Sequence, residues 1–301
     1  MMRAMFLAAV FAAPCSALAA DAFGTITILE GQALIYRDIA RLHAAEGLRL
    51  APGDIVETAP ATFAQIEMVD QSVAQLGPST RVMFNAAAAK QKSERGFFVM
   101  DGWVKVVAAK RNANEAGFEL RSALFEIAPH SAGLVLHAAP AAADLFVESG
   151  TIRLAERQER GASAPATALK AGDFYQRKFP ARGSVVGIAP PAFVAEMPRT
   201  FRDSLPPRIE RFRERPVMAK DAGAFSYADV QAWLQAEPAL RRPLMQRWRA
   251  KAHEPAFRAA LIANLKSHPE WDPILFPEKY KPKPPRAASA PASAPASAVS
   301  R

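Results

Sequence analysis

The stretch of residues 48–84 constrains the fold most strongly, because turn signals divide it into three short strand patterns. Residues 50–54 read Leu-Ala-Pro-Gly-Asp, which supplies the proline and glycine that a tight turn needs. Residues 55–58 are rich in β-branched side chains, and residues 64–69 alternate between apolar and polar with the period of two that strands show. A third pattern covers residues 82–84. The stretch therefore predicts a domain built of short β-strands.

Strand patterns continue on both sides of this stretch. Residues 40–46 allow two interpretations, a strand with polar breaks or a single helical turn. The pairs Asp101-Gly102 and Ser149-Gly150 predict hairpin turns, since glycine tolerates the left-handed conformation of tight turns. Residues 169–173, Leu-Lys-Ala-Gly-Asp, repeat the form of residues 50–54 and indicate two related halves that close near Ile188. The other strands that we expect are residues 24–29, 33–37, 97–100, 103–107, 118–121, 124–127, 134–137, 145–148 and 151–154.

This order of pieces resembles the FecR-like periplasmic domain family. Residues 50–58 follow its L-x-x-G-D-x-(I/V)-x-T pattern, and an alternating strand, a D-x-S turn at Asp70 and a final strand come next. Residues 148–154 are a one-residue variant of the E-G-x-(V/I)-x-(V/L) strand in the second series of that family. The resemblance covers residues 22–185 and implies a β sandwich or roll with a binding or scaffold role. It does not carry over signalling to a sigma factor, because only a signal peptide is expected ahead of the domain.

The N-terminus has the form of a cleaved export signal. Met1-Met2-Arg3 is a short basic start, residues 4–13 are apolar, and Ala17-Leu18-Ala19 has the small-x-small form of a cleavage site. The apolar run is shorter than the roughly 17–25 residues of a membrane span. We therefore expect a signal peptide over residues 1–20, cleavage near Ala19 to Asp21, and a periplasmic protein that does not span the membrane. Cleavage also removes Cys15, the only cysteine, and with it any disulfide.

The character of the sequence changes after residue 189. We expect residues 21–189 to fold by themselves as the β domain, and residues 190–222 to form a proline-rich basic linker. From Ser226, a favourable N-cap, apolar residues recur at helical spacing, which predicts a small all-α domain of three helices over residues 223–280. Residues 281–301 are rich in Pro, Ala and Ser and predict a disordered tail.

Charge separates the same two parts of the chain. Residues 1–198 carry 19 Lys and Arg against 19 Asp and Glu, whereas residues 199–301 carry 19 against 10 and so hold the whole formal charge of +9. A bundle that buries its apolar stripe turns its cations outward. We therefore predict a contact for an anionic partner at Arg241, Arg242, Arg247, Arg249 and Lys251. The competing interpretation is a solvated helix face.

The partner expected from these features is an envelope protein, an anionic polymer or an acidic lipid surface, and not a nucleic acid. The sequence has no G-x-S-x-G, H-E-x-x-H or glycine-rich phosphate motif, and we expect a protein that is not an enzyme and needs no cofactor or metal. Asp54 and Asp173 are interpreted as turn residues. The alternative function is a carbohydrate-binding protein or hydrolase of the cell envelope, anchored by its helical part. The side chains weighed for such chemistry are His43, His130, His137, His253, His268, Trp233, Trp248 and Trp271.

Overall fold

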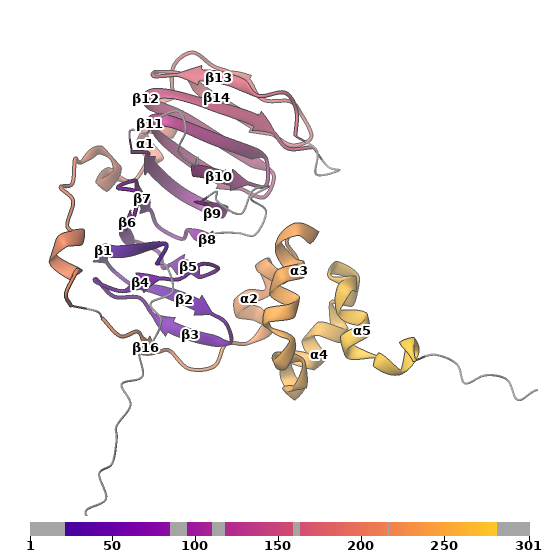
Figure 1. Cartoon of the computed structure of the whole chain (residues 1–301). Helices are drawn as coiled ribbons and strands as arrows, with labels where there is room; N and C mark the ends of the chain where they lie inside the picture. The colour runs from indigo at the N-terminus through magenta and orange to yellow at the C-terminus, as the bar shows by residue number, and fades with distance from the viewer. Residues whose placement is uncertain (1–21, 85–94, 110–117, 159–162, 216, 282–301) are drawn as a thin grey trace, which may run out of the picture.

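The computed structural model describes residues 22–84, 95–109, 118–158, 163–215 and 217–281 (Figure 1). Over these ranges the chain is mainly β, with a smaller helical region at the C-terminal end, as the sequence predicts. The expected signal peptide lies outside the described residues, as does the expected tail apart from Lys281. Within the described part of the chain, none of the helices has the length and apolar character needed to cross a bilayer.

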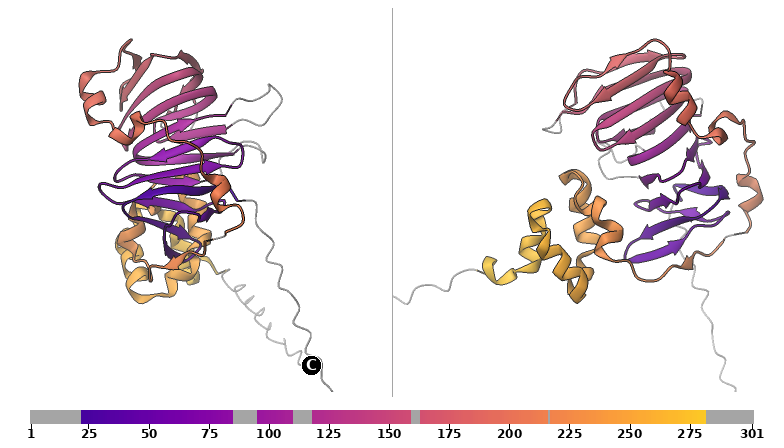
Figure 2. Two further views of the ribbon diagram at one scale, coloured as in Figure 1. Left: turned by 90° about the vertical axis from the view of Figure 1, so that its left-hand side faces the viewer. Right: turned by 180° about the vertical axis from the view of Figure 1, so that it is seen from behind.

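The strands of the described residues join into one connected sheet that curls around a long core (Figures 1 and 2). In Figure 1 they follow one another from β3 and β16 at the lower end to β13 and β14 at the upper end. This arrangement is compatible with a roll, and the sandwich or roll that the resemblance implies stays a prediction. The strands are β1 (Gly24–Glu30), β2 (Ala33–Arg37), β3 (Ala40–His43), β4 (Arg49–Leu50), β5 (Ile55–Thr58), β6 (Phe63–Met68), β7 (Val73–Leu76), β8 (Arg81–Phe84), β9 (Arg95–Val107), β10 (Phe118–Ser122), β11 (Phe125–Ala139), β12 (Ala142–Glu156), β13 (Thr167–Lys170), β14 (Phe174–Lys178), β15 (Ser184–Val185) and β16 (Lys220–Asp221).

Two predicted hairpins are wrong, because Asp101-Gly102 and Ser149-Gly150 lie inside single long strands, β9 and β12. The first half of β9 pairs with β8 and β10, while the part from Gly102 onward pairs with β7 and β11. Gly102 and Gly150 have φ of +97° and +71°, so each marks a corner at which a strand changes neighbours. A glycine with positive φ can form a bend within one strand as well as a hairpin turn between two strands. The residue type alone therefore does not distinguish these two structures.

The two Leu-x-x-Gly-Asp turns have the same geometry, as the repeat predicts. Gly53 and Gly172 both have φ of +89°. The carboxylate of Asp54 accepts the backbone N–H of Ala51 at 2.8 Å, and that of Asp173 accepts the N–H of Lys170 at the same distance. The interpretation of these aspartates as turn residues is therefore confirmed.

Three groups of buried apolar side chains hold the molecule together. The largest lies inside the curled sheet, and its fully buried members all come from residues 23–175. A second covers the outer face of β9, β12 and β6 with Phe193 and Phe201 from the segment that follows the sheet. The third joins the helices to the opposite outer face, where they cover Tyr36, Ile55 and Phe98. The helical region therefore shares its core with the β domain.

The predicted linker is a strap that crosses the β domain, drawn at the left of Figure 1. It begins with α1 (Pro191–Glu196) and η1 (Arg199–Arg202), continues through the single turn η2 (Ile209–Phe212), and ends as β16, which pairs with β3. Buried Glu67 on β6 binds it by accepting the backbone N–H groups of Arg208 and Ile209 at 2.7 and 3.0 Å. The strap places the helices at the other side of the sheet (Figure 2).

The helical region begins where the sequence predicts, with a capping box between Ser226 and Asp229 at the start of α2 (Tyr227–Leu234). Trp233, Trp248 and Trp271 are almost completely buried, which confirms them as core residues. The remaining helices are α3 (Pro238–Arg247), η3 (Arg249–His253), α4 (Pro255–Ala263), η4 (Leu265–Ser267), η5 (Pro269–Trp271), α5 (Asp272–Leu275) and η6 (Pro277–Tyr280).

Candidate functional site

The structure divides the five cations of the predicted contact into two groups. Three of them are held by partners within the chain. Arg241 forms two hydrogen bonds of 2.9 Å with the carboxylate of Glu270. Burial is the largest single influence on Glu270 and raises its pKa, but the hydrogen bonds from Arg241, a backbone hydrogen bond and the charges of Arg241 and Arg242 together lower the pKa of Glu270. Arg241 therefore stabilises the contact between α3 and η5.

Arg247 and Lys251 also have structural contacts. Arg247 donates from Nη1 to the carbonyl of Gly53, 2.6 Å away, and so binds α3 to the first Leu-x-x-Gly-Asp turn. Lys251 is only 4% exposed, and its ammonium lies 4.6 Å from the ring centre of Phe225 and 2.6 Å from Glu254. A cation in this setting stabilises the fold by cation–π attraction and is not available to a partner.

Arg242 and Arg249 remain exposed. The side chain of Arg242 is 68% exposed and, within the described part of the chain, its ion pair is a 3.8 Å approach to Glu270, which Arg241 already holds. Gln246 lies between these two arginines in sequence and His253 follows them, and both are exposed too, although α3 ends at Arg247 and residues 249–253 belong to η3. We call these four residues the α3 column. It is the part of the predicted contact that a partner can reach.

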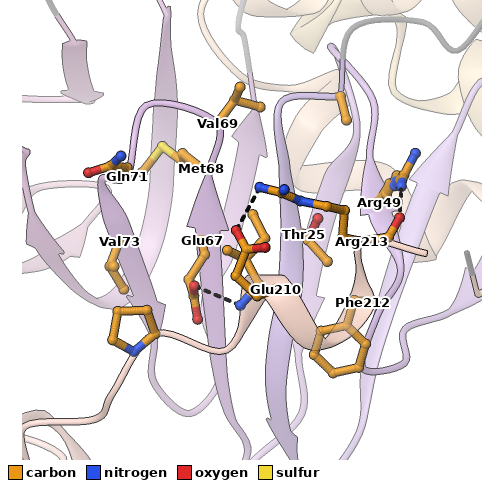
Figure 3. A pocket seen from close by; sticks show the side chains of 13 residues that line it. Thr25, Arg49, Glu67, Met68, Val69, Gln71, Val73, Glu210, Phe212 and Arg213 are labelled. Carbon is orange, nitrogen blue, oxygen red and sulfur yellow. Dashed lines mark hydrogen bonds and ion pairs between the residues drawn. The ribbon is translucent and has the colours of Figure 1, made fainter. Parts of the chain in front are cut away.

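A second candidate is a hollow of about 510 Å³ between the strap and strands β1, β6 and β7 (Figure 3). Its walls are largely apolar, and arginines lie at the rim. Arg49 donates to the backbone carbonyl of Arg213 at 3.0 Å, and the Arg213 side chain pairs with Glu210 at 2.8 Å. The sequence marks Arg213 as part of a basic linker but gives no signal for the hollow, which forms only when the strap meets the sheet. Its principal lining residues are Thr25, Met68, Val69, Val73, Ile209 and Phe212.

Two of the histidines weighed for catalysis, His137 and His268, have structural contacts, whereas His43 and His253 are exposed. His268 is fully buried and lies 3.0 Å from the Tyr227 hydroxyl, and burial lowers its pKa. His137 stacks on Trp103 with ring centres 4.1 Å apart, and desolvation lowers its pKa too. The His130 side chain lies outside the description. Among the described residues, no group of three or more His, Cys, Asp and Glu side chains could hold a metal ion.

Carboxylates also connect the helices to the sheet. The Trp233 indole N–H donates to Glu57 on β5 at 2.8 Å. Burial raises the pKa of Glu57, and this hydrogen bond opposes the rise. Arg157 at the far end of β12 pairs with Glu237 before α3 at 2.8 Å. These acids position the helical region and do not converge on an open cleft.

Comparison with solved structures finds two crystal structures, at 2.50 and 1.65 Å resolution, of a proposed anti-sigma factor from Parabacteroides distasonis ATCC 8503. The aligned parts are 10% and 11% identical, and the TM-score is 0.36 for both. The match spans 44% of this chain and 58% of those chains. A likeness at this level supports no argument about function. Comparisons with protein-family models and with curated proteins give no match.

Proposed function

We propose that this chain is a non-enzymatic periplasmic binding or scaffold protein. A FecR-like β domain forms its body, and the basic helical region contacts an anionic partner in the cell envelope. The single observation that carries the proposal is the α3 column, because it leaves Arg242 and Arg249 exposed while the neighbouring cations have internal partners. Two exposed guanidinium groups seven residues apart in sequence attract an anionic surface without any need for a pocket.

A binding role also agrees with the contacts of the acidic and histidine side chains that an enzyme could use for catalysis. Asp54 and Asp173 are bound to their own turns, and Glu57 and His268 have partners inside the molecule. Trp233 and Trp248 are buried and offer no face to a sugar ring, which weakens the case for a carbohydrate-binding protein. The proposed partner is therefore an acidic lipid head group, an anionic cell-wall polymer or an acidic protein surface.

The test is retention of the full chain on phosphatidylglycerol-containing vesicles and on cell-wall preparations at low salt. The double variant R242Q/R249Q should keep the melting temperature, because exposed substitutions change stability by no more than about 0.5 kcal/mol. It should lose retention, and native retention should fall as salt shortens the screening length towards about 8 Å. Substitution of Arg247 is left out of the variant, since that residue binds Gly53 and its loss would disturb the fold.

The matched control is R49Q/R213Q, which removes two cations near the strap and leaves the α3 column intact. It should be retained like the native protein. If the native chain is not retained, or if salt has no effect on its retention, the α3 column is only a solvated helix face and the proposal is wrong.

A further inference from the structure

The hollow beneath the strap has an apolar wall and a charged rim, on which Arg49 and Arg213 lie together with Glu210. On its β side, Val69 is 57% exposed, and Val73 is only half-buried. Val107 stands opposite Val73 in the pairing of β7 with β9 and is 45% exposed, so apolar surface extends beyond the hollow. Exposed valines gathered at the mouth of a hollow are a common feature of ligand sites.

The strap supplies the other wall. Ile209 and Phe212 from η2 face the β strands across the hollow, and Figure 3 shows Arg213 above the space between them. Arg213 pairs with Glu210, three residues away, and the two side chains are 73% and 69% exposed. A pair this exposed is weak and can exchange its carboxylate for that of a ligand. Arg49 uses one donor on a carbonyl and keeps its others.

Glu67 also lines the hollow, and its carboxylate binds the backbone of the strap. Its two oxygens accept the N–H groups of Arg208 and Ile209, and the amide of Gln65 donates to it at 3.2 Å. These donors satisfy the carboxylate at the bottom of the hollow, on the side of the strap backbone (Figure 3). Because these donors are uncharged, Glu67 keeps its negative charge, but its oxygens bind the strap backbone and the neighbouring amide.

We propose that this hollow binds a single-chain anionic amphiphile, such as a long-chain fatty acid. The acyl chain lies over Val69, Val73 and Phe212, and the carboxylate is held at the rim by Arg49 and Arg213. The volume of about 510 Å³ suits one such chain. An extended peptide has no strand to pair with here, because β1, β6 and β7 each have hydrogen-bonded neighbours on both sides. A carboxylate between two guanidinium groups gains charge-assisted hydrogen bonds.

The experiment titrates the full chain with dodecanoate below its micelle concentration, by calorimetry. We expect saturable binding at one site. R49Q/R213Q should weaken it about tenfold, because a charge-assisted contact is lost. V69D should weaken it by a similar factor, and dodecanol, which has the chain without the charge, should bind native protein more weakly. R242Q/R249Q is the matched control and should bind dodecanoate like the native chain.

Three results would overturn the proposal: no saturable binding, equal affinity in R49Q/R213Q, or equal binding of dodecyltrimethylammonium. A dimer that dodecanoate does not dissociate would also overturn it, since a second copy would then cover the valines. Melting temperatures of all variants, measured alongside, show that a loss of binding is not a loss of fold. The α3 column variant R242Q/R249Q is expected to leave dodecanoate binding unchanged. The outcome of this assay therefore does not depend on the function proposed for the α3 column.

Discussion

At the scale of single residues, Asp54 and Asp173 form a matched pair in two copies of one turn. Both cap their turn through a backbone N–H, but among the described residues Asp54 alone has a second side-chain partner. The guanidinium of Arg37 binds both of its oxygens, with an Nη2 to Oδ2 distance of 2.6 Å, and Asp54 is 1% exposed. The hydrogen bond with Asp54 is the main cause of a raised pKa at Arg37. The first turn is thus held by an ion pair that the second lacks.

This difference predicts unequal costs for the same substitution. D54A should lower the free energy of unfolding by about 2–3 kcal/mol, because it leaves Arg37 without its partner and Ala51 without its acceptor. D173A removes a single turn hydrogen bond and should cost about 1 kcal/mol. Urea denaturation of both variants measures the two values. Equal losses would show that the ion pair contributes nothing beyond the turn.

Local contacts of this kind could be predicted from sequence, and distant ones could not. The bond between Asp54 and the N–H of Ala51 joins residues three apart, so the turn pattern indicates it. Arg241 and Arg247 bind Glu270 and Gly53, which lie 29 and 194 residues away. Helical periodicity shows that an arginine is off the apolar stripe, but not whether another part of the chain already binds it. The sequence therefore does not indicate that Arg241, Arg247 and Lys251 have partners within the chain.

At the scale of elements, α2 is joined to β5 through Trp233 and Glu57. Glu57 is partly buried, and desolvation raises its pKa above the ordinary 4.5. With the pKa higher in the folded than in the unfolded chain, the folded state binds the proton more tightly. Stability is thus greatest below the unfolded pKa and declines as the pH rises through the folded pKa. The carboxylate costs stability at neutral pH in spite of its indole donor.

E57Q should remove this cost and keep an acceptor for the indole N–H. Relative to the native chain, E57Q should gain stability as the pH rises from about 4.5 towards neutrality. Thermal melts at several pH values, followed by tryptophan fluorescence, measure the difference. E57L is the control, since it leaves the Trp233 N–H without an acceptor and should be destabilised at every pH. A pH-independent difference between E57Q and the native chain would exclude a raised Glu57 pKa.

Sequence patterns located most of the strands and helices, but they did not show that some expected strands join into one longer strand. Strands β2 and β5 match the expected residues 33–37 and 55–58, because alternation and flanking turns define both ends. Residues 40–46, which were open between strand and helix, contain β3. The strands β4, β7, β13, β14, β15 and β16 were not predicted, and β9, β11 and β12 were each divided in two, β9 and β12 at a glycine. Whether a chain turns back or only bends at a left-handed glycine depends on its pairing partners, which are far away in sequence.

At the scale of the whole molecule, the two regions depend on each other unequally. The fully buried members of the main β core all lie within residues 23–175, so the sheet encloses that core without help from the helices. The helical core instead includes Tyr36, Ile55, Met83, Phe98 and Met100 from the sheet. Trp248 also donates its indole N–H to the carbonyl of Asp38 at 2.8 Å. The helices therefore need the sheet more than the sheet needs them.

Fragments of the chain test this asymmetry. Residues 21–189 alone should melt cooperatively, as the strand pattern predicts, because their main core is complete. They should also bind a hydrophobic dye and melt at a lower temperature than the full chain, since loss of the helices and strap uncovers Tyr36, Phe98 and Trp103. Residues 222–281 alone should show no cooperative transition, because Trp233 and Trp248 lose the sheet residues that bind their indole groups. A cooperative melt of that fragment would show that the helices form an independent domain, and a molten 21–189 fragment would show that they complete the β core.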